Sequence, residues 1–269
     1  MESCPFIDAL GVPLALAKPP QRIVSLIPSI TELLFSLGLD ERIVGVTRFC
    51  TYPPEGVTKK IKVGGGKDPD LKRILDLQPD LVIANVEENR REDVEALRAA
   101  SVPVFVTYPR TVREGIELIF TLGGLTETVP VAEAMAGPIE QVYRETVEQT
   151  RGRRPVKVFC PIWRRPYMSI NRDTYVHDVI RVSGGENIFA DRLERYPEVA
   201  LEDVERLQPE VVLLPDEPYP FKAKHIEELR TLDVPAIRDG RIFLIDGKIL
   251  SWYGPRIGDS LRVLRELLV

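Results

Sequence analysis

LKRILDLQPDLVIA at Leu71–Ala84 and LEDVERLQPEVVLL at Leu201–Leu214 repeat one pattern in two parts of the chain. Each stretch is a short helical segment that ends in Leu-Gln-Pro and an acidic residue, followed by an apolar run. VEALRAASVPVFV at Val94–Val106 and IEELRTLDVPAI at Ile226–Ile237 repeat a second pattern, a helix that stops before Val-Pro and a strand. Because the two patterns recur in the same order at nearly the same spacing, the sequence predicts two similar lobes.

Short apolar runs alternate with helical segments in each lobe, and such runs are typical of buried parallel strands. The series begins at Ile23–Ile27; Ser29 or Thr31 is expected to cap the following helix, and Gly38 to end it. We therefore expect an α/β fold of two Rossmann-like lobes with parallel sheets. The other expected strands are Ile43–Val46, Leu81–Ala84, Val104–Val106, Val156–Cys160, Val211–Leu214 and Ile242–Ile245.

One long helix is expected between the lobes, over Thr128–Gln149, with its first turn at Pro130. Gly137-Pro138 should kink this helix or begin a new segment. The predicted organisation is an N-terminal lobe over 1–127, a connecting backbone helix over 128–151 and a C-terminal lobe over 152–269. Two lobes braced by such a helix leave a cleft, which is where small ligands bind.

The composition excludes several classes of protein. With 36 basic and 41 acidic residues the formal net charge is −5, which argues against nucleic-acid binding. No apolar stretch is long enough for a membrane helix, so no direct membrane insertion is expected. No signal peptide is visible, which indicates a cytoplasmic protein unless a leader was removed. Cys4, Cys50 and Cys160 lack metal-binding spacing and, with only two histidines, no metal site is expected; the thiols are expected to be idle.

Loops that follow parallel strands form the binding edge of such sheets. In this chain those loops are rich in aromatic and cationic side chains, which suit a large, partly planar ligand with amide or anionic groups. An aromatic residue at such an edge can equally cover the core, and a lone arginine can be a solvated charge. The aromatic residues are Phe49, Tyr52, Trp163, Tyr167, Tyr219, Phe221, Trp252 and Tyr253, and the arginines are Arg48, Arg164, Arg165 and Arg256.

Signals for catalysis are weak, because no known catalytic motif is present and no nucleophile, base and orienting group are assembled. Gly64-Gly65-Gly66-Lys67 lacks the spacing of a phosphate-binding loop, so its glycines are expected to let the backbone approach a bulky ligand. His177 is expected to pack or cap at the start of a helix, and His225 to face solvent. We expect neither an enzyme nor catalytic residues.

Five stretches resemble the class III substrate-binding proteins, also called the helical-backbone metal receptor superfamily, and in particular their cobalamin-binding branch. They cover nearly the whole chain from Arg22 onward. That family has two α/β lobes joined by one long helix, so the resemblance implies the same architecture. The stretches are RIVSLIPSITELLFSLGLDERIVGVTRFCTYPPE, LKRILDLQPDLVIA, VSGGENIFAD, LQPEVVLLPDEPYPF and SWYGPRIGDSLRVL.

The resemblance implies a ligand, a corrinoid or similar metal chelate held between the lobes, and no catalytic cofactor. It also implies an ABC transporter permease as partner, a periplasmic location, and one glutamate per lobe for docking, for which Glu88 and Glu217 are the candidates. The family often carries aromatic residues at Gly64–Lys67 and at Asn85-Val86, where this chain has none. The implied ligand contacts, with Arg48 added from its loop position, are Arg48, Tyr52, Gly65, Gly66, Lys67, Val86, Glu87, Trp163, Arg164, Trp252, Tyr253 and Arg256.

Three functions follow as hypotheses. The first is a binding protein for a cobalamin-like corrinoid, with ABC-type uptake as its expected role. The second keeps the fold but binds an anionic iron chelate, a siderophore or haem, which the four arginines favour. The third is a cytoplasmic corrinoid-handling enzyme or sensor on the same scaffold.

Overall fold

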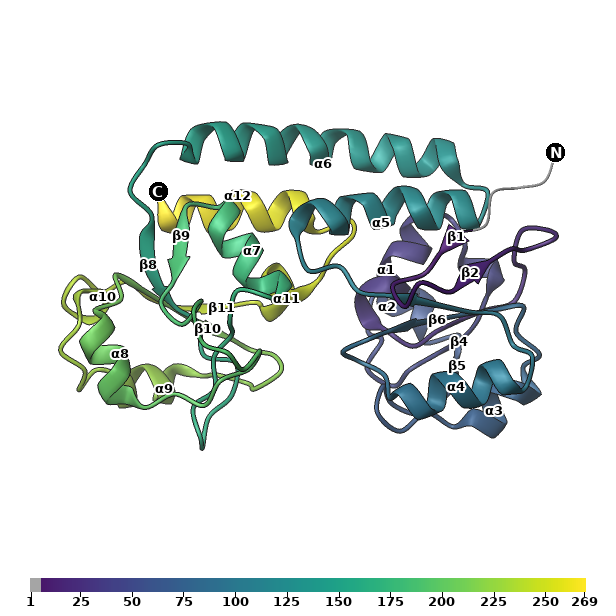
Figure 1. The fold of residues 1–269 in the computed structure, drawn as a ribbon, viewed down its shortest axis with the longest axis horizontal. Helices are drawn as coiled ribbons and strands as arrows, with labels where there is room; N and C mark the ends of the chain where they lie inside the picture. The colour runs from purple at the N-terminus through teal and green to yellow at the C-terminus, as the bar shows by residue number, and fades with distance from the viewer. Residues whose placement is uncertain (1–5) are drawn as a thin grey trace. The chain divides into compact units, whose positions relative to one another are not determined.

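The structure, a computed structural model, describes residues 6–269, and these divide into two compact units (Figure 1). Unit 1 runs up to Pro109 and also contains Gly115–Gly137 and Tyr253–Pro255. Unit 2 contains Arg110–Glu114, Pro138–Trp252 and Arg256–Val269, so each unit includes short segments from distant parts of the chain. No helix within residues 6–269 combines the length and the apolar character needed to cross a bilayer. Cys4 lies outside the described residues.

Unit 1 is built on a five-stranded parallel sheet in the order β5-β4-β3-β6-β7. Every residue of β6 is buried, as expected for a parallel sheet covered on both faces. A separate antiparallel pair, β1–β2, precedes this sheet. The strands are β1 (Phe6–Ile7), β2 (Pro13–Leu14), β3 (Ile23–Ser25), β4 (Ile43–Val46), β5 (Ile61–Lys62), β6 (Leu81–Asn85) and β7 (Val104–Thr107).

The helices of unit 1 cover both faces of its sheet. The chain moves outward from β3 through β4 to β5, then returns to β6, so right-handed crossovers place α1 and α2 on one face and α3 and α4 on the other (Figure 1). The helices are α1 (Pro28–Ser36), the 3-10 turn η1 (Asp40–Arg42), α2 (Pro54–Val57), α3 (Leu71–Asp76), α4 (Arg91–Ala99) and α5 (Val112–Leu125), which crosses the unit boundary.

The predicted cap of α1 is wrong. The helix begins at Pro28 with Ile27 as its N-cap, and no side chain caps it. Pro28 is suited to this position because it has no N–H to satisfy and its φ is already helical. Thr31 Oγ1 instead donates to the Ile27 carbonyl over 2.9 Å, inside the first turn. Gly38, with φ +78°, follows the helix end as predicted.

Unit 2 repeats the scheme with a four-stranded parallel sheet in the order β11-β10-β8-β9. Its strands are β8 (Val156–Phe159), β9 (Gly185–Asn187), β10 (Val211–Pro215) and β11 (Ile242–Ile245). Its helices are α7 (Tyr175–Val182), α8 (Leu201–Leu207), α9 (Ala223–Leu229), α10 (Pro235–Arg238), α11 (Gly247–Ser251) and α12 (Ile257–Leu268).

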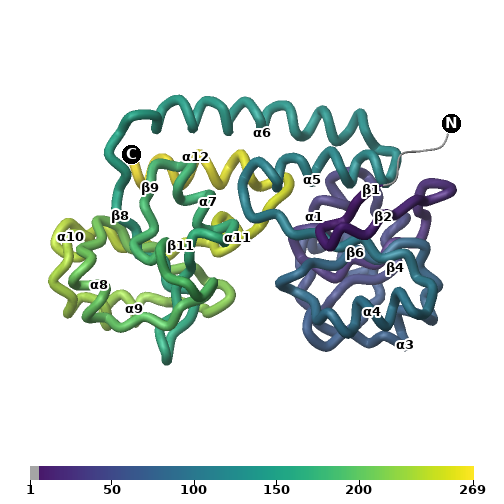
Figure 2. Tube along the Cα trace, in the orientation of Figure 1, coloured from purple at the N-terminus to yellow at the C-terminus, as the bar shows by residue number. Residues whose placement is uncertain are grey.

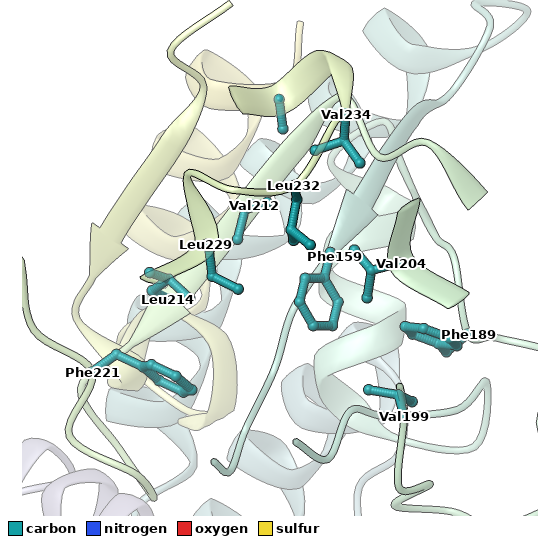
Figure 3. Close-up of a cluster of buried hydrophobic side chains, with 11 residues drawn as sticks. Phe159, Phe189, Val199, Val204, Val212, Leu214, Phe221, Leu229, Leu232 and Val234 are labelled. Carbon is teal, nitrogen blue, oxygen red and sulfur yellow. The ribbon is translucent and has the colours of Figure 1, made fainter. Parts of the chain in front are cut away.

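A buried apolar cluster lies between the unit 2 sheet and the helices α8, α9 and α10 (Figure 3). Within this cluster, Phe159 of β8 and Phe189 meet edge to face, with ring centroids 5.9 Å apart. Val204 of α8 and Leu229 of α9 pack onto the same cluster from the helices. The predicted strands and helices therefore supply part of this core, and Phe189, Val199 and Phe221 add to it from outside the predicted elements.

α6 (Val129–Thr150) is one helix, and it crosses the unit boundary. The possibility that a new segment begins at Gly137-Pro138 is wrong, because the helix continues through Pro138 (Figure 2). Proline removes one N–H from the hydrogen-bond ladder, and the remaining turns of this long helix are sufficient to maintain it.

The internal repeat is present in the backbone. Gln78 and Gln208 occupy the same place in the two Leu-Gln-Pro motifs, and both adopt left-handed φ values, +47° and +52°. The second motif differs: Val102-Pro103 leads directly into β7, whereas Val234-Pro235 begins α10, so the strand expected directly after Val234-Pro235 is wrong. Proline suits a helix start as well as a strand start, and the sequence alone did not separate these outcomes.

Candidate functional site: the carboxyl edges of the two sheets

Each sheet has a point where the strand order reverses. In unit 1 this point lies between β3 and β6, and in unit 2 between β8 and β10. In open α/β sheets, ligands bind outside the carboxyl ends of the strands at such points. The turn after β6 carries Val86 and Glu87, and the loop after β8 carries Trp163 and Arg164. The topology of each unit therefore places two of the predicted ligand residues at its favoured binding edge.

Asn85, the last residue of β6, shapes the turn in unit 1. Its Oδ1 accepts hydrogen bonds from the backbone N–H of Glu87 at 2.8 Å and of Glu88 at 3.3 Å. Its Nδ2 donates to Tyr253 Oη at 2.9 Å. The turn therefore leaves Val86 exposed and Glu87 half-buried at the sheet edge. Sequence reasoning missed Asn85, although an asparagine at the end of a strand is a known turn signal.

The glycine-rich loop after β5 is tied to this turn. Asn89 Nδ2 donates to the Gly66 carbonyl at 3.0 Å, and Lys67 Nζ donates to the Glu87 carbonyl. A Cβ atom on Gly66 would lie 2.8 Å from the Glu88 carbonyl oxygen, which explains the glycine by packing within the protein. The structure therefore brings together Gly65, Gly66, Lys67, Val86 and Glu87.

The loop after β4 supplies apolar surface and one anchored charge. Phe49 and Tyr52 are exposed, and the Arg48 guanidinium lies 4.9 Å from the centre of the Phe49 ring. Arg48 Nη2 also forms an ion pair with Asp68 at 2.9 Å, which links this loop to the glycine-rich loop. The positive charge of Arg48 is therefore partly compensated before any ligand binds.

An aromatic group forms the corresponding edge of unit 2. Trp163 is 43% exposed and meets Tyr219 edge to face, with ring centroids 5.6 Å apart. Tyr219 in turn contacts Phe221 at 4.8 Å, and Phe221 is buried in the core cluster. The exposed tryptophan therefore stands on a stack of rings that reaches the core.

Arg164 lies beneath this surface. Its side chain is only 12% exposed, and its Nη2 forms an ion pair with Glu228 of α9 at 2.6 Å. The neighbouring Tyr167 hydroxyl has a raised pKa because burial disfavours its charged form. Glu228 was not predicted, because its partner is distant in the sequence.

The prediction that His225 faces solvent is wrong. Its side chain is buried, and its ring packs against Tyr219 and Phe221 with centroids 5.5 Å from each. Its Nδ1 accepts a hydrogen bond from the Lys222 backbone N–H at 2.8 Å, at the start of α9. Burial lowers the pKa of His225, which therefore stays neutral near pH 7. His225 supports the aromatic group from below.

The predicted residues near the end of the chain are more enclosed. Trp252 and Tyr253 are each 7% exposed. The Trp252 ring has the Arg256 guanidinium 5.3 Å and the Lys248 ammonium 5.9 Å from its centre, within unit 2. Tyr253 belongs to unit 1, and burial raises the pKa of its hydroxyl. The ligand roles of these three predicted residues remain predictions.

The two predicted docking glutamates differ in environment. Glu88 is exposed at the β6 turn, whereas Glu217 is half-buried and accepts a hydrogen bond from Ser251 Oγ at 3.4 Å. Burial raises the pKa of Glu217, and the nearby Lys248 ammonium opposes that shift. Within residues 6–269, no group of three or more His, Cys, Asp or Glu side chains could hold a metal ion.

The fold and these edges define a class of protein. The chain belongs to the periplasmic binding protein family, whose model matches residues 23–249. It is therefore a substrate-binding protein.

Three comparisons show how similar the chain is to known proteins. The vitamin B12-binding protein of Vibrio cholerae serotype O1 is 25% identical over 259 residues, which are 96% of this chain and 93% of that protein. The haem-binding protein RhuT from Roseiflexus sp. RS-1 superposes with a TM-score of 0.79 at 28% identity, covering 92% of this chain and 97% of that one. The vitamin B12-binding protein BtuF of Vibrio cholerae gives a TM-score of 0.81 at 24% identity over 93% and 96% of the two chains, a likeness of fold.

Proposed function

We propose that the protein binds a cobalamin-like corrinoid through the carboxyl-edge loops of its units, as the binding component of an ABC importer. The observation that carries this proposal is the exposure of aromatic side chains at those edges. Phe49 and Tyr52 in unit 1 and Trp163 in unit 2 are exposed, although most large apolar side chains of the described residues are buried. Exposed aromatic groups at the predicted binding edge of each unit favour a ligand with an apolar face.

Trp163 is the residue best placed to contact a macrocycle. Its contact with Tyr219 fixes one edge of the indole, while its exposed fraction of 43% leaves surface for a ligand. A side chain held in place before binding loses little conformational entropy when the ligand arrives. A rigid aromatic surface of this kind favours a flat or large apolar ligand.

The partners of the arginines favour a corrinoid over a dicarboxylate chelate. Arg48 is paired with Asp68, and Arg164 with Glu228, so each cation has a carboxylate next to it. The net charge offered to a ligand by each pair is therefore close to zero. Paired guanidinium and carboxylate groups still donate and accept hydrogen bonds, which suits the peripheral amides of a corrinoid better than the two carboxylates of haem.

Haem is the second candidate, and one comparison favours it. The 28% identical RhuT is a haem-binding protein, whereas the 25% identical Vibrio cholerae relative binds vitamin B12. Arg256 and Lys248 place two cations near the Trp252 ring, and Lys248 also forms an ion pair with Asp246 at 2.9 Å. Titration of the same protein sample with cyanocobalamin and with ferric haem separates the two candidates, because each ligand has its own absorbance spectrum.

A tryptophan substitution tests the proposed contact. Trp163→Ala should weaken cyanocobalamin binding about tenfold or more, since the loss of one aromatic contact corresponds to about 1.5 kcal/mol. Phe120→Ala is the matched control, because Phe120 is an exposed aromatic on α5, away from the strand ends. Equal affinities of the two variants, measured by calorimetry, would remove Trp163 from the site.

Docking to a transporter through Glu88 and Glu217 belongs to the same proposal. It predicts that Glu88→Gln lowers uptake by the reconstituted importer without changing cyanocobalamin affinity. Glu217→Gln should act similarly only if the half-buried carboxylate turns outward on docking, because in the structure it interacts with Ser251.

A further inference from the structure

A cavity of about 620 Å³ lies in unit 2 at the opposite end of its sheet from Trp163. Val156, the first residue of β8, and Gly185, the first residue of β9, both line it, whereas Trp163 follows the carboxyl end of β8. The end of α6, the starts of these two strands and the end of α12 come together there (Figure 2). This cavity is therefore separate from the carboxyl-edge loops of the same unit.

The cavity is basic, although the chain as a whole is acidic. Four arginines and His177 line it, with Glu186 as the carboxylate side chain on its wall. The side chains on this wall are therefore mostly cationic, although the net charge of the whole chain is −5. Concave basic surfaces attract anions because the low-dielectric walls concentrate the field. The four arginines are Arg151, Arg153, Arg154 and Arg181.

The arginines differ in how far they are already neutralised. Arg154 is held by Glu210 through two hydrogen bonds, at 3.0 and 2.5 Å, and Arg181 by Asp178 at 2.6 Å. Arg151 pairs with Glu148 at 3.1 Å, but both side chains are about 70% exposed, so this pair is weak. Arg153 forms no ion pair or side-chain hydrogen bond within residues 6–269. Arg153 and Arg151 are therefore the cations available to a ligand.

His177 adds an unsatisfied hydrogen-bonding atom. Its Nδ1 is buried and has no hydrogen-bond partner in the described part of the chain. Buried polar atoms are normally paired, so this nitrogen is an exception, and it belongs to a residue that lines the cavity. The prediction that His177 lies near a helix start is confirmed. Its backbone N–H donates a hydrogen bond to Thr174 Oγ1, the cap of α7, at 3.1 Å. That hydrogen bond uses the backbone, so it leaves Nδ1 of the ring without a hydrogen-bond partner in the described residues.

The remaining wall is apolar, from Val147, Pro155, Val156 and Leu268. We propose that this cavity binds a small organic anion, one that joins a phosphate or carboxylate group to an apolar body. The anionic group would lie against Arg151 and Arg153, and the body against the apolar wall. This site does not depend on corrinoid binding at the carboxyl-edge loops.

Phenyl phosphate is a suitable probe, because it combines a dianion with an aromatic body. It should bind the full chain at millimolar concentration or below and raise the melting temperature, whereas neutral benzyl alcohol should not. Inorganic phosphate should bind more weakly than phenyl phosphate if the apolar wall contributes. Raising the salt concentration should weaken phenyl phosphate binding, since the contacts are partly exposed.

Matched arginine substitutions locate the site. Arg153→Gln should weaken phenyl phosphate about tenfold, and Arg151→Gln with Arg153→Gln should abolish measurable binding. Arg144→Gln is the control. Arg144 is an exposed arginine on α6, the helix that contributes Val147 and Thr150 to the cavity wall, but Arg144 does not line the cavity. Trp163→Ala should leave phenyl phosphate affinity unchanged, which separates this site from the corrinoid site. Absence of binding at about 10 mM probe, or equal loss in Arg144→Gln, would overturn the proposal.

Discussion

Asn85 connects three segments of unit 1 that are far apart in the sequence. Its side chain accepts a hydrogen bond from Glu87 in the β6 turn, donates to Thr107 of β7 at 3.3 Å, and donates to Tyr253, which follows α11, at 2.9 Å. A buried amide with several partners is costly to remove, because each partner loses its hydrogen bond without regaining water. The geometry of the predicted ligand residues Val86 and Glu87 therefore depends on a residue that is itself buried.

Asn85→Ala should lower the free energy of unfolding by about 2 kcal/mol, and Tyr253→Phe by about 1 kcal/mol. Because the two side chains share a hydrogen bond, the double variant should lose less than the sum of the single losses. Urea unfolding measures all three values. Strict additivity would show that the Asn85–Tyr253 contact contributes nothing to stability.

The buried thiol of Cys160 gives a pH-dependent prediction. Burial raises its pKa from 9.0 to about 12. Between these pH values the unfolded thiol loses its proton while the folded thiol keeps it. The contribution of this thiol to the free energy of unfolding is therefore fully present below about pH 9 and is lost as the pH rises towards about 12. In a Cys4→Ser background, a thiol reagent at pH 8 should leave the native protein unlabelled, since burial also raises the pKa of Cys50.

Two observations would contradict this account of Cys160. One is rapid labelling of the native protein at pH 8, and the other is a stability that stays flat between pH 9 and pH 12. Cys160→Ala should reduce the slope of the free energy of unfolding against pH in that range.

At the scale of single elements, the two copies of the Leu-Gln-Pro motif end their helices alike but are stabilised differently. Gln208 Nε2 donates to the Glu205 carbonyl at 2.6 Å and to the Asp233 carbonyl at 2.8 Å. The Gln78 side chain has no such hydrogen bond within residues 6–269. Both residues are in the left-handed region, which costs a non-glycine residue about 1 kcal/mol.

Gln78→Gly should therefore raise the free energy of unfolding by about 0.5 kcal/mol, because it relieves strain and removes no contact. Gln208→Gly should lower it by about 1 kcal/mol, because two hydrogen bonds are lost for the same relief. Thermal or urea unfolding compares the two variants directly. Equal effects of the same sign would show that the side chain of Gln208 is not a stabilising cap.

The sequence predicted elements well where local signals were strong. β4 and β11 have the predicted bounds, and α6 lies within one residue of its predicted start and end. Local signals failed where the same residue can begin either a helix or another element, as Pro28 and Pro235 do when each begins a helix. They also failed at His225, which packs against aromatic rings that only folding brings close to it. The candidate site shows the same limit, because Glu228 and Asp68 meet Arg164 and Arg48 across loops that no local pattern relates.

At the scale of the whole molecule, the chain is a substrate-binding protein with two parallel-sheet units, and the family match covers residues 23–249. Its carboxyl-edge loops combine exposed aromatic rings with arginines that already have carboxylate partners. That combination is the basis for preferring a corrinoid to an anionic chelate, because paired arginines offer hydrogen bonds with little net charge.

Calorimetric titration of the purified full chain with cyanocobalamin tests this preference most directly. The expected result is one ligand per chain, bound with a Kd of about 1 µM or tighter, and a weaker interaction with ferric haem under the same conditions. No detectable binding at about 100 µM cyanocobalamin, with tight binding of ferric haem, would contradict the account.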